Sequence, residues 1–425
     1  MKIRLIFFSL LLLCLSNCDK DDRIVTDSNG VVVRRPHLWA TAISKNGAMH
    51  DISVWTPIIY NESNFLVGSE KDDQRSILSL SAQDGHVNWE WSDLQGLLSN
   101  PSYKDPISIF RRTYYQLDNK FFFNYSSSSY CIDLNTGQTL WKNKIQRARY
   151  SNNAGIDDLY FSAGAEYDPL GEEKIYWGNI NSAADEQLLL RPDYTEVTNP
   201  PVNAQGYLNS MRPFKNGNDT YLAFGMENPY TDFTPAGSGF TELNLYNLTQ
   251  SKYEYKKVVI NPIRETRMIS DLFYQSGILY FQSLNYIHGH EAMTGKELWR
   301  VYLGSYSGTS RMILADNRLF SACENGLLYC VDALTGIFLW REQNTVTCSE
   351  LSYLNGVIYY LGGGFLHAVD AGSGKHLWKI ESPAVKDSSD EWFNGVCIAV
   401  PGQGADKGVV VATTGLNAYG YEAIR

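Results

Sequence analysis

Short hydrophobic stretches, each followed by a turn signal, fill most of the chain. In residues 318–341 the order is RLFSAC, ENG, LLYCVDALTG and IFLWRE. An Asn-Gly dipeptide between apolar, β-rich runs is a strong hairpin signal. ALTG forms a second turn between the last two runs. With the preceding SRMILAD, this segment predicts four antiparallel strands in about 40 residues.

The same pattern recurs, and in each copy a glycine lies four residues before a tryptophan. The copies end at Trp89, Trp141, Trp299, Trp340 and Trp378. A four-stranded unit of this size cannot bury both of its faces alone, so it has to stack against its neighbours. A repeat that fills most of the chain therefore predicts a propeller or a solenoid.

The interval between Trp141 and Trp299 is long enough for two more units with weaker patterns. Leu189 lies near the tryptophan position of the first, and Tyr253 or Tyr255 lies near that of the second. Both units contain insertions rich in Pro, Asn, Gly and aromatic residues. These two units raise the number of complete repeats to seven.

The two ends of the chain each contain part of one further unit. Trp39 in HLWATAI has no strands before it, and the C-terminal GVVVATTGLNAYGYEAI has no tryptophan strand after it. Joining the two ends completes one unit and removes the open edges that a propeller avoids. The predicted fold is all-β: an eight-bladed β-propeller of four-stranded antiparallel blades, closed by N- and C-terminal strands sharing one blade.

Aspartate and glycine recur in the turn before each tryptophan strand. Asp332 can accept hydrogen bonds from backbone N–H groups just ahead, and Gly336 can adopt the positive φ that the turn needs. A general-acid pair needs two carboxylates converging on a substrate, whereas these aspartates occur once per unit. Turn capping is therefore predicted for Asp133, Gly137, Gly295, Asp332, Gly336, Asp370 and Gly374.

The motif apolar-Asp-x-x-Thr-Gly-x-x-x-Trp, as in Val331 to Trp340, resembles the repeat of the PQQ-like (quinoprotein-type) β-propellers. The resemblance covers nearly the whole mature chain and is clearest in four units. In that family, tryptophans dock between neighbouring blades. The resemblance therefore implies a blade-docking role for Trp39, Trp89, Trp141, Trp299, Trp340 and Trp378.

Some members of that superfamily are quinoprotein dehydrogenases. They are usually longer, often have an adjacent Cys-Cys pair beside the quinone, and hold calcium near a catalytic aspartate. This chain contains no Cys-Cys dipeptide. We therefore predict no cofactor and no catalytic or cofactor-binding residue, with a PQQ-dependent quinoprotein as the less favoured alternative.

The sequence HGH at residues 288–290 places two imidazoles on one face of a strand, at a spacing that can hold a metal ion. Aligned with the other repeats, however, His288 falls where Tyr130, Tyr329 and His367 stand. This alignment favours a packing position, so no metal site is predicted.

The N-terminus has the features of a secretory signal. Lys2 and Arg4 precede an apolar run, residues 5–15, that is too short to span a membrane. Residues 15–18, LSNC, resemble a bacterial lipobox, which implies cleavage before Cys18 and lipidation, including palmitate, of that cysteine. The alternative is an ordinary cleaved signal. The predicted parts are a signal peptide (1–17), a lipid-anchored tether (18–35) and the propeller (36–425).

The residues after Cys18 bear on location. Asp19, Lys20, Asp21 and Asp22 resemble a signal that exports lipoproteins to the outer leaflet, although they also fit a solvated, extended tether. The predicted location is therefore the outer membrane, on its periplasmic face or at the cell surface.

Charge and cysteine content limit the partners and the cross-links. Without Lys2 and Arg4 the chain has 34 basic and 46 acidic residues, a net charge of about −12, which disfavours nucleic acid. The cysteines are too sparse for a disulfide framework. Cys131 and Cys330 share one repeat position, which indicates small buried side chains. Whether a disulfide forms among Cys323, Cys330, Cys348 and Cys397 stays open.

The nearest functional model by resemblance is the BamB-type family of outer-membrane assembly lipoproteins. It implies a non-catalytic scaffold that binds envelope proteins, including barrel-assembly components. The alternative is a surface glycan-binding or glycan-processing propeller, in keeping with the 28 tyrosines. Insertions at residues 199–218 and 227–239 are expected either to bind the partner or to be tolerated surface variation.

Overall fold

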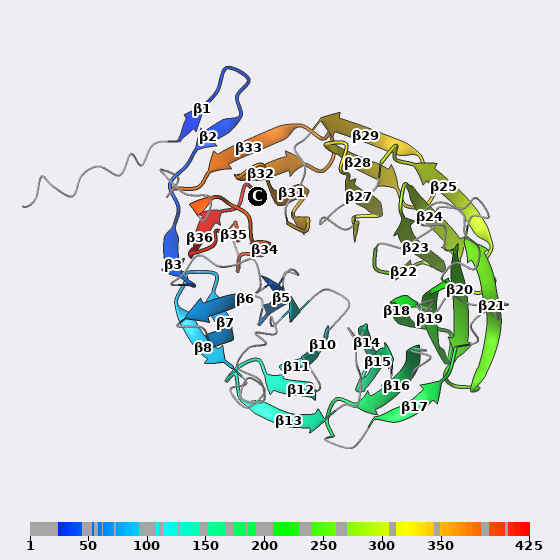
Figure 1. The fold of residues 1–425 in the computed structure, drawn as a ribbon. Helices are drawn as coiled ribbons and strands as arrows, with labels where there is room; N and C mark the ends of the chain where they lie inside the picture. The colour runs from blue at the N-terminus through cyan, green and yellow to red at the C-terminus, as the bar shows by residue number, and fades with distance from the viewer. Residues whose placement is uncertain are drawn as a thin grey trace, which may run out of the picture.

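The structure, a computed structural model, is a closed ring of β-sheets (Figure 1). It describes residues 24–44, 53–54, 58–61, 63–71, 74–92, 108–109, 114–125, 128–144, 152–165, 173–182, 186–192, 207–228, 240–260, 270–305, 312–343, 349–383, 391–403 and 407–425. These residues form no α-helix, and among them no helix is long and apolar enough to cross a membrane.

Seven blades each consist of four consecutive antiparallel strands, with the first strand innermost and the fourth outermost (Figure 1). The first four of these blades are β5 (Ile58–Tyr60), β6 (Asn64–Lys71), β7 (Gln74–Ser81) and β8 (Val87–Trp91); β10 (Tyr114–Leu117), β11 (Lys120–Tyr125), β12 (Ser128–Asp133) and β13 (Thr139–Lys144); β14 (Asn153–Ile156), β15 (Leu159–Ala165), β16 (Glu173–Asn179) and β17 (Gln187–Leu190); and β18 (Tyr207–Asn216), β19 (Asp219–Asn228), β20 (Phe240–Asn247) and β21 (Lys252–Ile260).

The next three blades contain the clearest repeats. They are β22 (Phe273–Gln275), β23 (Ile278–Ser283), β24 (Tyr286–Glu291) and β25 (Glu297–Tyr302); β26 (Ile313–Ala315), β27 (Arg318–Ala322), β28 (Leu327–Asp332) and β29 (Phe338–Gln343); and β30 (Ser352–Leu354), β31 (Val357–Gly362), β32 (Phe365–Asp370) and β33 (His376–Glu381).

Both ends of the chain build the eighth blade. β34 (Cys397–Val400), β35 (Val409–Thr413) and β36 (Asn417–Glu422) supply its inner strands, and β3 (Trp39–Ala42) is its outermost strand. β3 runs antiparallel to β36, with Trp39 opposite Gly420. The predicted eight-bladed propeller with a shared closing blade is confirmed.

The region expected as a tether is partly β-structure. β1 (Val25–Thr26) and β2 (Val32–Arg34) form a hairpin, and β2 pairs in parallel with the outer edge of β33 (Figure 1). Its turn is capped by the Asp27 carboxylate, which accepts hydrogen bonds from the backbone N–H groups of Asn29 and Val31. The side chain of Arg35 forms an ion pair with Glu422 at 2.7 Å. Strand pairing with the propeller therefore begins before residue 36.

A separate two-stranded parallel sheet lies between blades. It pairs β4 (Ser53–Val54) with β9 (Ser108–Ile109), which come from the connections before and after the β5–β8 blade.

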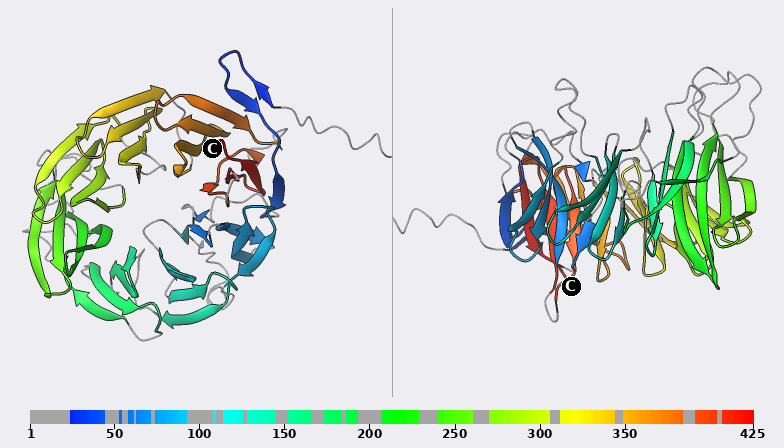
Figure 2. Two further views of the ribbon diagram at one scale, coloured as in Figure 1. Left: turned by 180° about the vertical axis from the view of Figure 1, so that it is seen from behind. Right: turned by 90° about the horizontal axis from the view of Figure 1, so that it is seen from below.

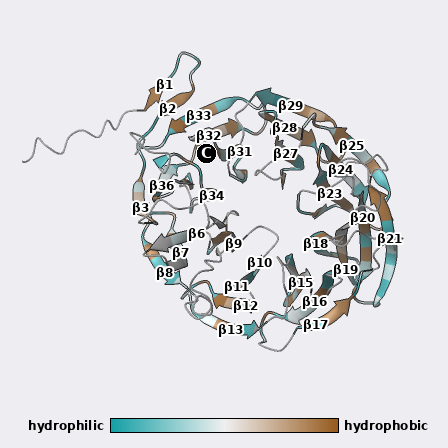
Figure 3. Ribbon diagram, in the orientation of Figure 1, coloured by the Kyte–Doolittle hydropathy of each residue, from teal (hydrophilic) through white to brown (hydrophobic). Residues whose placement is uncertain are grey.

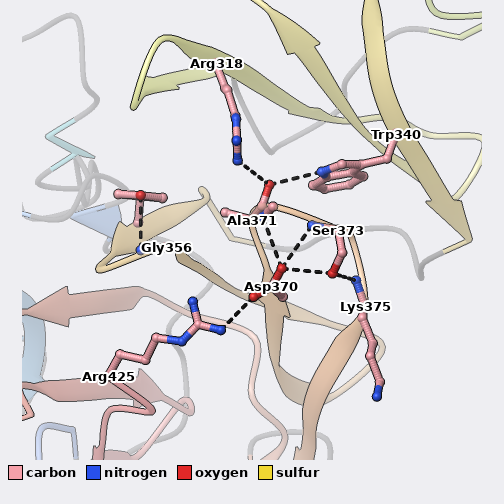
Figure 4. Close-up of polar contacts among 10 residues, drawn as sticks. Arg318, Trp340, Gly356, Asp370, Ala371, Ser373, Lys375 and Arg425 are labelled. Atoms are coloured by element: carbon pink, nitrogen blue, oxygen red, sulfur yellow. Dashed lines mark hydrogen bonds and ion pairs between the residues drawn. The ribbon is translucent and has the colours of Figure 1, made fainter.

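Tryptophans of the outer strands reach across to the next blade. Four indole N–H groups donate to a backbone carbonyl oxygen there: Trp39 to Ala82 at 2.8 Å, Trp89 to Leu134 at 2.7 Å, Trp141 to Ile180 at 3.0 Å and Trp340 to Ala371 at 3.0 Å. The indole N–H of Trp299 has no hydrogen-bond partner among the described residues. Figure 4 shows Ala371 also accepting a hydrogen bond from Arg318, at 3.1 Å. These contacts join neighbouring blades at the same repeat position.

The turn glycines explain the fixed spacing of the repeat. Gly336 has φ +71°, and a Cβ built there would lie 2.6 Å from the Trp299 ring of the preceding blade. Gly374 has φ +76° and is covered in the same way by Trp340, with a closest ring atom at 2.8 Å. Both the backbone conformation and the space therefore require glycine. Each glycine belongs to its own blade's turn but receives the tryptophan of the blade before.

The two weaker units contact the next blade through residues other than tryptophan. The Tyr255 hydroxyl donates to the carbonyl oxygen of Ala292 at 3.2 Å, so this tyrosine makes the contact that a tryptophan makes elsewhere. Leu189, half-buried in β17, packs into the apolar cluster that joins its blade to the next. Trp378 is 3% exposed and packs against the closing blade with residues such as Val410 and Tyr421.

The core lies between the blades. Hydrophobic and hydrophilic residues alternate along many strands (Figure 3), and the buried apolar side chains form clusters that span neighbouring sheets. Cys131 lies opposite Trp141 and Cys330 opposite Trp340, and both thiols are buried. The four described cysteines, Cys131, Cys323, Cys330 and Cys397, are not linked by disulfides, whereas Cys348 lies outside the described residues.

Candidate functional site

The two faces of the propeller differ in the connections that they present. Because strands alternate in direction, the turns between first and second strands and between third and fourth strands lie on the same face. The C-terminus, which follows the third strand of the closing blade, lies on that face too (Figure 2). We call it the C-terminal face. The Asp-Gly turns of the clear repeats, Asp133–Gly137, Asp332–Gly336 and Asp370–Gly374, lie there.

The repeat aspartates cap these turns. Asp332 Oδ1 accepts hydrogen bonds from the backbone N–H and the hydroxyl of Thr335, at 2.8 and 2.7 Å. These bonds lower the pKa of the Asp332 carboxyl. Asp370 Oδ1 likewise accepts from Gly372 and Ser373, and its Oδ2 pairs with Arg425 at 2.7 Å (Figure 4). Because each carboxylate is occupied within its own turn, these residues do not form a convergent acid–base pair.

One of these turns exposes a run of apolar side chains. The exposed fractions are 70% for Leu334, 63% for Ile337, 40% for Phe338 and 47% for Leu339. Leu334 and Ile337 lie in the connection between β28 and β29, and Phe338 and Leu339 begin β29. We call these four residues the apolar ridge. Exposed apolar residues that are close together in the chain, as these are, mark an interaction site more often than scattered ones do.

Three positions of the ridge are particular to one blade, whereas the position of Leu339 also holds leucine in the three repeats compared below. Counted from the turn aspartate or its equivalent, the positions of Leu334, Ile337 and Phe338 hold Asn135, Gln138 and Thr139 in the β12–β13 repeat, Met293, Lys296 and Glu297 in the β24–β25 repeat, and Gly372, Lys375 and His376 in the β32–β33 repeat. Among these four repeats, all three positions are apolar only here. The fold therefore does not require apolar residues at these positions.

The ridge also lies on an open sheet edge. β29 is the last strand of its sheet, and most of its residues are exposed. The equivalent edge of β33, in the next blade, is occupied by β2, with Val32 opposite Trp378. The chain itself thus shows that the outer edge of a blade in this propeller can accept one more strand.

Other exposed aromatic residues lie apart from the ridge. Among the described residues, Tyr302 is 57% exposed at the end of β25 and Trp392 is 49% exposed in the connection before β34. Trp392 lies against the glycine turn between β31 and β32, where a Cβ at Gly364 would be 3.6 Å from its ring. Within the described ranges, these exposed aromatic side chains come from different blades.

A buried polar cluster lies between β24 and β25. His288 Nδ1 is 3.5 Å and His290 Nε2 is 3.9 Å from Oε2 of Glu297. The two imidazoles are 0% and 2% exposed, and the glutamate reaches the surface. His288 stacks on Phe281, with ring centroids 4.9 Å apart, as His367 stacks on Tyr360 in another blade. His288 therefore does fill a packing position of the repeat, as its alignment predicted, but it also faces a second histidine and a carboxylate.

Burial determines the charge of this cluster. It lowers the pKa of His288, and it lowers the pKa of His290 to about 4. The neighbouring side chain of His288 lowers the pKa of Glu297. At neutral pH the cluster therefore holds two neutral imidazoles and one carboxylate. Arg300 lies 3.7 Å from Oε1, the other oxygen of the carboxylate.

The sequence did not reveal Glu297 as part of this cluster. A bulge between Gly289 and His290 shifts the register, so Trp299 lies opposite Gly289 and Glu297 lies opposite His290. The same bulge precedes the tryptophan strand in the other clear repeats, including between Cys330 and Val331. Applying the register of one repeat to the next would have identified the glutamate.

Several predicted features lie outside the described residues. These are the signal peptide, Cys18 and the insertion residues 199–206 and 229–239. The rest of the first insertion is ordered: it forms β18 and the beginning of the turn to β19.

The fold is that of an eight-bladed β-propeller with PQQ-like repeats. Residues 284–422 match the family model described as outer membrane protein assembly factor BamB. This stretch contains the β24–β36 strands and therefore both the apolar ridge and the histidine cluster. No curated protein matches the chain.

Solved structures are similar in fold over most of the chain. The computationally designed Ika8 protein has a TM-score of 0.56 at 14% identity, covering 90% of this chain and 99% of its own. A europium-containing methanol dehydrogenase has a TM-score of 0.58 at 11% identity, covering 90% and 85%. BamB from Moraxella catarrhalis has a TM-score of 0.48 at 13% identity, covering 81% and 94%. Identities this low show the fold alone, and the fold serves both an enzyme and a designed protein.

Proposed function

We propose that the protein is a non-catalytic lipoprotein scaffold of the outer membrane that binds an envelope protein through the apolar ridge. The observation that carries this proposal is the exposure of Leu334, Ile337 and Phe338 at positions where three other repeats have mostly polar residues. An exposed apolar side chain gains free energy when a partner covers it, at about 25 cal/mol per Å² of buried apolar area.

The partner binds along the edge of β29. An extended segment can add to an exposed sheet edge through main-chain hydrogen bonds, while pockets or ridges select its side chains. The pairing of β2 with β33 supports this mode, because it places an extra strand at the equivalent edge of the next blade. The partner segment is therefore extended and carries apolar residues that pack on Ile337 and Leu339.

The partner is a component of the barrel-assembly machinery. Support comes from the match of residues 284–422 to the model of an outer-membrane assembly factor, since the ridge lies within that stretch. The lipobox-like residues 15–18 add a membrane anchor at Cys18. Together these features keep the scaffold at the membrane where β-barrel proteins are inserted.

The test is a mild-detergent pull-down of the lipidated protein from its own envelope, with mass spectrometry of the bound proteins. A ridge variant carries L334N, I337Q and F338T, the residues of the β12–β13 repeat. L140S is the matched control, because Leu140 is an exposed residue (47%) in the outer strand of another blade.

We expect barrel-assembly components with the wild type and with L140S, and their loss with the ridge variant. If the ridge variant recovers these components as well as the wild type does, the partner does not bind through the ridge. Recovery of glycan-uptake proteins in place of barrel-assembly components would favour the glycan-binding alternative.

A further inference from the structure

We propose that His288, His290 and Glu297 form a binding site for a divalent transition-metal ion, with Zn²⁺ as the best match. This inference is independent of the proposed protein-binding function, because it rests on a different blade and on different residues. In the described part of the chain this is the one group of three or more His, Cys, Asp or Glu side chains whose ligand atoms converge, all within 4.8 Å of one another.

The orientation of His290 is the strongest support for the site. Its Nδ1 lies 2.8 Å from the carbonyl oxygen of Gly295. A carbonyl can only accept, so Nδ1 carries the proton, and in a neutral ring Nε2 then carries a lone pair. That lone pair faces Glu297 Oε2 at 3.9 Å. A cation bound between these two acceptors would satisfy both.

His288 presents a second nitrogen to the same point. Its Nε2 is held by the hydroxyl of Ser283 at 2.7 Å, which leaves Nδ1 facing Glu297. Neither His288 Nδ1 nor His290 Nε2 has a hydrogen-bond partner among the described residues, although both are buried. Metal-bound histidines usually have their other ring nitrogen fixed by such an outer partner. Ser283 and Gly295 already provide these partners.

The chemistry of the donors favours zinc. Two neutral imidazoles and one carboxylate are a common zinc ligand set that leaves one position open for water. In a tetrahedral site with bonds of about 2.0–2.1 Å, ligand atoms lie about 3.3 Å apart. The distances of 3.5 and 3.9 Å to Glu297 need only small side-chain movements to reach this value. Because Glu297 is partly exposed, the ion can enter from solvent on that side.

The other repeats show that packing alone does not require these residue types. Three other repeats have different residues at the positions of His288, His290 and Glu297. In that order they are Leu78, Leu80 and Val87 in the β7–β8 repeat, Tyr130, Ile132 and Thr139 in the β12–β13 repeat, and Tyr329, Val331 and Phe338 in the β28–β29 repeat. An aliphatic residue stands at the His290 position in each of them. The histidine therefore replaces a side chain that would bury more easily.

The test is a calorimetric titration of the tag-free, EDTA-treated mature chain with ZnCl₂, with Co²⁺ absorption as a second readout. We expect about one equivalent of Zn²⁺ per chain and a visible Co²⁺ spectrum typical of a nitrogen- and oxygen-bound ion. H290V should weaken binding at least about 100-fold, and E297T at least about 10-fold. Valine and threonine stand at these positions in other blades, so both variants should fold.

The control is H376T in the β32–β33 repeat, where two histidines lie near each other without a third ligand in the described structure. His367 and His376 have ring centroids 5.8 Å apart. H376T should leave zinc binding unchanged. The proposal is overturned if the wild type binds no Zn²⁺ at 1 mM, because its affinity would then be on the order of 1000-fold weaker than that of a micromolar site. It is also overturned if folded H290V binds Zn²⁺ as tightly as the wild type.

Discussion

The indole N–H of Trp340 donates to the carbonyl oxygen of Ala371 in the next blade at 3.0 Å (Figure 4), and the same ring covers Gly374. One side chain thus supplies both a hydrogen bond and a packing surface between two sheets. The same relationship joins Trp39 to Ala82 and Trp89 to Leu134. The tryptophan of the repeat therefore joins neighbouring blades wherever this pair of contacts occurs.

Replacing Trp340 with alanine should lower the free energy of unfolding by about 3–5 kcal/mol, the usual cost of truncating a large aromatic residue at a packed position. Urea titration followed by circular dichroism measures the change. W392A is the control: Trp392 is 49% exposed, so its loss should cost less than about 1 kcal/mol. A loss below about 1 kcal/mol for W340A would contradict the docking role.

Replacing Gly336 with alanine should destabilise the protein through two separate effects. The left-handed backbone, φ +71°, costs of order 1 kcal/mol for alanine, and the new methyl group would overlap the Trp299 ring. G277A provides the comparison, because Gly277 has φ +81° and a methyl group there would meet no described atom within 4 Å. We expect G336A to cost at least about 1 kcal/mol more than G277A. Equal losses would show that the tryptophan does not restrict the position.

The stability of the protein should fall as the pH falls below 6.5, in part through His367. Burial lowers the pKa of this side chain to about 4. Between about pH 6.5 and 4 the unfolded chain binds the proton and the folded chain does not, so protonation favours unfolding. From pH 7.5 to pH 5 this single group should reduce the free energy of unfolding by about 2 kcal/mol.

The variant H367Y isolates this contribution. It should fold, since Tyr130 and Tyr329 occupy the corresponding position in two other repeats. Its unfolding free energy should change less between pH 7.5 and pH 5 than that of the wild type, by the amount given above. An identical pH dependence for both proteins would mean that His367 is already protonated in the folded state.

The number and closure of the blades could be predicted because the repeat fixes both. Each unit shows its own hairpin signal, turn aspartate and docking residue, and the incomplete units at the two ends fit each other. Trp39 and the C-terminal strands therefore identified the shared blade without any knowledge of contacts. Tyr255 was recognisable as a docking residue only by its spacing, which is why Tyr253 remained an alternative.

Other features depend on relationships that sequence patterns do not show. The β1–β2 hairpin has a recognisable turn at Asn29-Gly30, but its pairing with β33 depends on an open edge far away in the chain. Glu297 joins the two histidines only because a bulge shifts the strand register. The sequence does not distinguish Leu334 and Ile337 from buried repeat residues, because their exposure depends on the folded structure. Edges, register shifts and exposure are properties of the assembled ring.

The most direct test of the binding role is site-specific photocrosslinking in the intact envelope. A photoreactive amino acid is placed at Ile337 in the ridge or at Gln138, the corresponding position of the β12–β13 repeat. We predict a covalent adduct with a barrel-assembly protein from position 337 and none from position 138. Adducts of equal yield from both positions, or none from position 337 in a folded and correctly located protein, would contradict the account.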